Sequence, residues 1–124
     1  MKQKLMTMDE VVVAMKAVGW AASWRSVEAL AVIWAESGGD AYAVGINDQD
    51  PTSPAFLSLD RGLVQWNSYW HPNITDRIAF DPELTLKVFL ETTTNFNIYR
   101  TMWNGFLNGA YKQHLPAARK PWGL

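Results

Sequence analysis

One carboxyl group of the sequence lies where a charged carboxylate is unfavourable. Glu36 falls in the last turn of a predicted helix, shortly before Gly38 and Gly39. There it faces the negative end of the helix dipole, and its apolar neighbours Trp34 and Ala35 withdraw it from water. Both effects favour the protonated form that a general acid requires. The competing interpretation is an exposed glutamate without a function.

A second carboxyl group, Asp60, is the candidate partner of Glu36. It lies in a predicted polar loop directly before Arg61, where solvent and the Arg61 charge would keep it ionised. A protonated Glu and an ionised Asp across a groove are the two groups that glycoside hydrolysis uses. One protonates the leaving oxygen, and the other stabilises or captures the oxocarbenium-like centre. With 12 acidic residues in the chain, such a pair is not specific by itself.

The stretch that follows Asp60 combines amides with flat aromatic rings. Amides hydrogen-bond to sugar hydroxyl and N-acetyl groups, and rings stack on sugar faces. In an extended segment Trp66 and Trp70 would share one face, and the other face would carry Gln65, Asn67 and Tyr69. We therefore expect at least one of these faces to belong to the core.

Two stretches of the chain, residues 32–40 and 60–67, resemble the lysozyme superfamily. More narrowly, they resemble the lysozyme-like domains of the soluble lytic transglycosylase type that bacteria and phages carry. Glu36-Ser37-Gly38 is similar to the end of the catalytic helix in that family, and residues 62–65 are similar to its cleft motif Gly-Leu-x-Gln. The resemblance continues to residues 108–111 and so covers most of the chain.

The resemblance implies a fold and a set of site residues. The implied fold is α+β and predominantly α, with a small β or irregular element beside the cleft. By the same match Glu36 is the catalytic acid and Asp60 the second carboxylate. The implied substrate-binding residues are Ser37, which often supports the acid, Gln65, Asn67, Tyr69, Trp70 and Trp103.

This chain also departs from the family pattern. The interval from Glu36 to Asp60 is longer than in animal lysozymes, and Trp66 stands where an aliphatic residue or Met is usual. The asparagine-isoleucine motif of many transglycosylases has only Asn97-Ile98 as its counterpart. These departures leave open whether Asp60 takes part in catalysis.

The function that the resemblance implies is cleavage of the β-1,4 bond between N-acetylmuramic acid and N-acetylglucosamine in peptidoglycan. A lysozyme, or muramidase, would use Glu36 and Asp60, with water completing the reaction. A lytic transglycosylase would need only Glu36 and would form 1,6-anhydro-muramic ends. An alternative of another class is a non-catalytic module that binds the cell wall or builds a virion. We expect hydrolysis, with peptidoglycan glycan strands as the binding partner of a monomer.

Composition sets further limits. The 124 residues suit one domain, which we expect to span 1–124, and the net charge of −1 disfavours a nucleic-acid binder. The chain has no cysteine and two distant histidines, so we expect neither a metal nor a cofactor. No apolar run suggests a membrane span or a secretory signal. We therefore expect a bacteriolytic phage endolysin, a virion-associated enzyme, or a domain cut from a longer protein.

Four helices are predicted around these candidate site residues. A capping box at Thr7–Glu10 opens the first, which Gly19 ends, and the second begins near Ser23 or Trp24 and stops at Gly38. Residues 38–60 are predicted as loop and turn. Short extended pieces, expected at 56–59 and 63–66, are predicted to form a small hairpin. Asp81-Pro82 opens a helix through about Glu91. The last helix is predicted over 99–115, with Pro116 stopping it.

Overall fold

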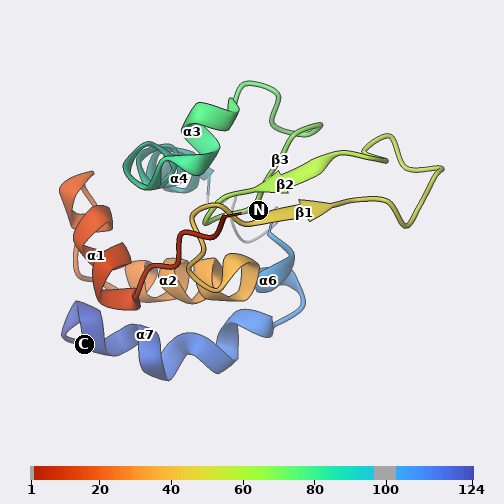
Figure 1. Ribbon diagram of the computed structural model, residues 1–124. Coiled ribbons are helices and arrows are strands. Elements are labelled where there is room, and N and C mark those ends of the chain that lie inside the picture. Colours follow the sequence, from red (N-terminus) through yellow and green to blue (C-terminus); the bar gives the residue numbers. More distant parts are fainter. Residues whose placement is uncertain (1, 97–102) are drawn as a thin grey trace.

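The computed structural model describes residues 2–96 and 103–124 of the chain (Figure 1). The fold is α+β and predominantly α. Its helices are α1 (Met8–Ala17), α2 (Trp24–Ser37), α3 (Asp76–Phe80), α4 (Pro82–Phe96), α6 (Asn104–Leu107), the 3-10 helix η1 (Ala110–His114) and α7 (Leu115–Trp122). Three short strands, β1 (Val44–Ile46), β2 (Leu59–Arg61) and β3 (Trp66–Asn67), form an antiparallel sheet in that order. Within the described residues, no helix is both long enough and apolar enough to cross a bilayer.

The first two helices begin and end where local chemistry requires. In α1 the Thr7 hydroxyl accepts the backbone N–H of Glu10, and the Glu10 carboxylate accepts the N–H of Thr7. In α2 the Ser23 hydroxyl accepts the N–H of Ser26, and Gly38 ends the helix in the left-handed conformation with φ of 62°. The predicted capping box, the start of the second helix and its glycine stop are confirmed.

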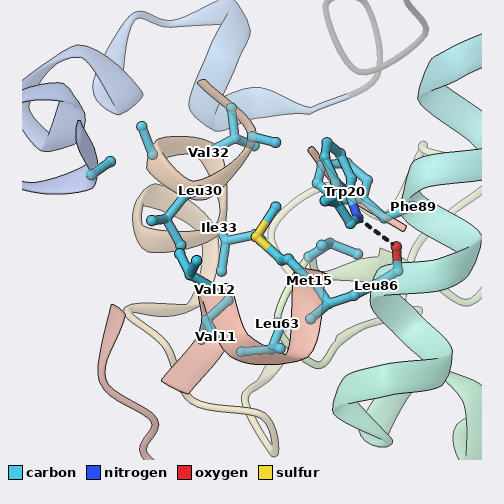
Figure 2. Close-up of a cluster of buried hydrophobic side chains, with 14 of the residues drawn as sticks. Val11, Val12, Met15, Trp20, Leu30, Val32, Ile33, Leu63, Leu86 and Phe89 are labelled. Carbon is cyan, nitrogen blue, oxygen red and sulfur yellow. Dashed lines mark hydrogen bonds between the residues drawn. The ribbon is translucent and has the colours of Figure 1, made fainter. Parts of the chain in front are cut away.

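Helix α2 passes through the centre of the helical part of the molecule and contacts α7, η1 and α6 (Figure 1). Its middle residues are fully buried. Figure 2 shows Leu30, Val32 and Ile33 of α2 in a cluster with side chains of α1 and α4. In the same cluster the Trp20 indole Nε1 donates to the Leu86 carbonyl at 3.0 Å. The packing of α2 on several sides fixes the position of the helix, whose partly buried last turn carries Glu36.

The glycine pair after α2 serves two separate purposes. Gly38 supplies the left-handed cap, and Gly39 lets the chain pass close to an aromatic ring. A Cβ atom on Gly39 would lie 2.7 Å from both the Trp34 ring and the Met6 carbonyl oxygen. The Trp34 side chain therefore packs over this turn and braces the end of the helix that presents Glu36.

Two predicted elements were wrong. Residues 63–65 form a turn, and the strands of the sheet lie at 44–46, 59–61 and 66–67, because pairing across the chain sets their positions. The last helix, predicted over 99–115, is divided in its described part into the short helix α6 and the 3-10 helix η1. Pro116 does not end it, since this proline lies in the first turn of α7, where a missing N–H costs nothing. The helix from Asp81-Pro82 is confirmed at its start and runs on to Phe96. The stretch Asn97-Ile98 lies outside the described residues.

Gly62 offers a test of how tightly the sheet fits against α3. Its φ is +78°, and a Cβ atom there would lie 1.9 Å from the Ala79 carbonyl oxygen. We expect Gly62→Ala to lower the free energy of unfolding by more than about 2 kcal/mol in urea titrations, because backbone must move. Gly109→Ala is the matched control: φ is +77° but nothing lies within 4 Å, so about 1 kcal/mol is expected. Equal losses in the two variants would contradict this close packing.

Candidate functional site

A cleft of about 740 Å³ lies where the end of α2 meets the sheet. It brings together residues that are far apart in the sequence. The predicted site residues that line it are Glu36, Asp60, Gln65, Asn67, Trp70 and Trp103. The rest of the lining comes from His71 and from several residues between Ile46, at the end of β1, and Phe56, in the loop before β2.

Glu36 reaches this cleft from the last turn of α2, and its side chain is half-buried. Asp60 reaches it from the middle of β2, 24 residues later in the chain. The expectation that Asp60 lies in a loop was therefore wrong, since it belongs to a paired strand. The outcome is that two carboxyl groups held on different, well-anchored elements line one cleft, as the glycosidase interpretation requires.

Asp60 is held in place by its neighbours across the sheet. On one side it pairs with Asn67 of β3, whose Nδ2 donates to Asp60 Oδ1 at 2.9 Å. On the other side it pairs with Gly45 of β1. A Cβ atom on Gly45 would lie 3.7 Å from Asp60 Oδ2 and 3.3 Å from Gln65 Oε1. Glycine at this position leaves the space beside both functional groups open.

Arg61 does not share the surroundings of Asp60. Its side chain is buried, its Nη1 forms an ion pair with Asp76 at 2.9 Å, and its Nε donates to the Trp66 carbonyl at 3.2 Å. Consecutive residues of a strand point to opposite faces of the sheet. The expectation that Arg61 acts on Asp60 within a shared loop was wrong for this reason, and Arg61 instead ties β2 to α3.

Asn67 uses its whole amide to organise the site. Its Nδ2 donates to Asp60 and also to Ser58 Oγ, each at 2.9 Å. Its Oδ1 accepts the backbone N–H groups of Tyr69 and Trp70, at 2.9 and 3.0 Å. An amide has two donor hydrogens and two acceptor positions, so these four bonds saturate it. Asn67 was predicted as a supporting and substrate-binding amide; its contacts fit the supporting role.

The two tryptophans of this segment lie in different surroundings. Trp66 is 1% exposed and belongs to the core, where its Nε1 donates to Thr85 Oγ1 at 2.8 Å. Trp70 is 61% exposed at the edge of the cleft. The prediction that both rings share a face assumed an extended segment, but the turn at 68–70 ends the strand after Asn67.

Gln65 adopts an uncommon conformation for a residue other than glycine, with φ of 58°. Its Nε2 donates to the carbonyl oxygens of Ala43 and Gly62, at 3.1 and 2.9 Å. Both donor hydrogens are thus used, and the amide has Oε1 left to offer at the cleft. Strained backbone at a cleft residue is typical of functional sites.

Three further predicted residues differ in how they relate to the cleft. Ser37 is not among the lining residues; its hydroxyl donates to the Ile33 carbonyl and accepts the Gly39 N–H. Tyr69 is exposed and packs edge-on against Trp70, outside the cleft lining. Trp103 lines the cleft although it is buried, and its Nε1 donates to the Val64 carbonyl.

Two parts of the cleft lining, His71 and the long connection between β1 and β2, were not predicted as site residues from the sequence. The two ends of the connection are joined by a hydrogen bond from the Leu57 N–H to the Asn47 carbonyl. Within it, the Asp50 carboxylate accepts hydrogen bonds from the backbone N–H and the hydroxyl of Thr52. These two bonds to Thr52 lower the pKa of the Asp50 carboxyl group. The abundance of turn-forming residues in this connection was visible in the sequence. Its position over the cleft depends on strand pairing.

His71 is half-buried in the cleft wall. Burial, followed by the nearby positive charge of Arg61, lowers the pKa of its imidazole below 6.5. Below pH 6.5 the unfolded chain therefore takes up a proton at this residue before the folded protein does. Folding stability should fall as the pH decreases from 6.5 through the lowered pKa.

This pH dependence is a testable prediction. The free energy of unfolding, measured in urea between pH 7.5 and 5, should decrease toward acid, and His71→Phe should remove part of that slope. His114→Gln is the matched control, since His114 lies on η1 and not in the cleft wall. An unchanged slope in His71→Phe, or a pKa of His71 at or above 6.5 by NMR titration, would contradict it.

Comparison with known proteins places this architecture in a family. No curated protein and no solved structure gave a match. A family model described as a lysozyme-like domain matches residues 10–97, which include most of α1, all of α2, the sheet and both cleft carboxyl groups. Domains of this kind act on the glycan strands of peptidoglycan. With most of its length matched, and with its predominantly helical α+β fold, the chain belongs to the lysozyme-like domain family.

Proposed function

We propose that this chain is a bacteriolytic muramidase that hydrolyses the β-1,4 bond between N-acetylmuramic acid and N-acetylglucosamine. One observation carries the proposal: Glu36 at the end of α2 and Asp60 on β2 line the same cleft. Glu36 protonates the glycosidic oxygen as the bond breaks. Asp60 stabilises or captures the positive charge that develops at the sugar C1 atom. Water, deprotonated by Glu36, then completes the reaction.

The surroundings of each carboxyl group support these roles. Asp60 is oriented by the amide of Asn67, and it pairs with Gly45, whose missing side chain leaves the space beside the Asp60 carboxylate open. Gln65 offers an acceptor oxygen, and the exposed Trp70 offers a ring face at the edge of the cleft. These are the polar and stacking contacts that a glycan strand needs.

We further propose that residues 1–124 work as one catalytic domain and as a monomer. The site as proposed draws on residues from Glu36 to Trp103, so that a single chain supplies it. Action on the bacterial cell wall suits a phage endolysin or a virion-associated enzyme.

The proposal is tested by incubating the protein with purified sacculi and measuring the release of soluble fragments and new reducing ends. We expect both with the unmodified chain and neither with Glu36→Gln. A protein that sediments with sacculi but releases nothing would be a wall-binding module, and the proposed function would be wrong. Release of fragments without new reducing ends would favour the lytic transglycosylase.

A further inference from the structure

The imidazole of His71 lies in the cleft wall without a role in the proposed chemistry. Its ring packs edge-on against Trp66, with 4.9 Å between the ring centroids, and lies nearly parallel to Trp103 at 6.4 Å; the two tryptophans also contact each other. Its backbone N–H donates to the Asn67 carbonyl at 2.9 Å. The ring is thus placed by both packing and backbone, next to the residues that orient Asp60.

The cleft offers many acceptor atoms and few unused side-chain N–H donors. The carboxylate of Asp60 and the Oε1 of Gln65 accept hydrogen bonds, and the O–H of protonated Glu36 is the one that the proposed reaction gives to the glycosidic oxygen. The amide hydrogens of Gln65 and Asn67 and the indole N–H of Trp103 already have protein acceptors. Among the described residues of the cleft, by contrast, the His71 imidazole and the indole N–H of the exposed Trp70 make no hydrogen bond, and of these two side chains only His71 is half-buried in the wall.

This distribution matters because the glycan carries a group that only accepts. Sugar hydroxyl groups can donate to the acceptors of the cleft, but the carbonyl oxygen of an acetamido group needs a donor. A neutral imidazole carries one N–H, and burial favours the neutral form of His71. A cleft that buried this carbonyl oxygen without a hydrogen-bond donor would bind the N-acetylated sugar less tightly.

We propose that His71 is a specificity-determining residue that donates a hydrogen bond to the acetamido carbonyl oxygen of a bound sugar. The proposal rests on the proposed function, since it assumes that the cleft binds a β-1,4-linked amino-sugar strand. It predicts that the contribution of His71 to binding depends on the N-acetyl group and not on the sugar ring itself.

The experiment combines two ligands with three variants, all carrying Glu36→Gln so that no cleavage occurs. The ligands are the β-1,4 tetrasaccharides of N-acetylglucosamine and of glucosamine, and the measurement is the Kd by calorimetry. His71→Phe keeps a ring against Trp66 and Trp103 but removes the N–H. We expect it to weaken binding of the acetylated ligand about 5- to 10-fold and that of the other less than about 2-fold. His71→Gln, which restores an N–H donor, should recover part of the loss.

The third variant, Trp70→Phe, tests the neighbouring ring as the rival donor. An N-acetyl-dependent loss in Trp70→Phe and none in His71→Phe would overturn the proposal. Equal losses of affinity for both ligands in His71→Phe would also overturn the proposal, because the loss would then come from altered packing and not from the N-acetyl group. Binding of neither ligand also overturns it. The sacculus digestion described above judges the proposed function independently, since cleavage by the unmodified chain can persist in any of these cases.

Discussion

Glu36→Gln will abolish glycan cleavage while the protein stays folded. The amide has nearly the shape of the carboxyl group but has no proton to give to the leaving oxygen, and general acid catalysis contributes about 10²- to 10⁴-fold. The rate of reducing-end release from sacculi measures the loss. Stability should be unchanged or slightly raised, because Glu36 lies in the last turn of α2, where the helix dipole disfavours an anion.

The control for this variant is Glu91→Gln, which changes an exposed glutamate on α4. It should cleave at the rate of the unmodified chain. Activity of Glu36→Gln within a few-fold of the parent would remove Glu36 from the mechanism. A marked drop in its Tm would instead show that Glu36 has a structural role.

Asp60→Asn should lower the rate of cleavage by at least about 100-fold. In a hydrolase with two carboxyl groups, the developing positive charge at C1 would lose its anion, and such electrostatic groups contribute on this scale. The Asn67 amide that orients Asp60 can still donate to the new side chain's oxygen, so the fold should be kept. Initial rates on soluble glycan strands, with circular dichroism as a check of folding, measure both expectations.

Asp50→Asn is the matched control, because Asp50 also lines the cleft but lies in the connection between β1 and β2. It should cost far less activity than Asp60→Asn. A loss of only a few-fold in Asp60→Asn would contradict the role given to Asp60. In a transglycosylase the 6-hydroxyl group of muramic acid completes the reaction, and a second carboxylate is not required.

The parts of the fold that follow local rules could be predicted from the sequence. The capping box at Thr7–Glu10, the Ser23 cap of α2 and the Gly38 stop each depend on a few neighbouring residues. The position of Glu36 in the last turn of α2 followed from the same reasoning. The resemblance of the motifs around Glu36 and Gln65 then indicated the family that the comparison shows.

The parts of the site that depend on strand pairing could not be predicted in this way. Because Asp60 lies in β2, Arg61 points to the opposite face and pairs with Asp76. The turn that Asn67 caps separates Trp70 from the buried Trp66, although the spacing of the two rings suggested a common face. The register of the sheet is set by contacts between distant residues, and it also carries the 47–56 segment to the cleft.

The most direct test of the proposed reaction is to digest purified peptidoglycan in water enriched in oxygen-18 and to read the products by mass. Hydrolysis at the muramic acid C1 atom places one solvent oxygen at each new reducing end. We predict fragments with labelled reducing N-acetylmuramic acid ends, formed by the unmodified chain and not by Glu36→Gln. Unlabelled 1,6-anhydro-muramic ends, or sacculi that stay intact, would contradict the proposal that this cleft hydrolyses the glycan strand.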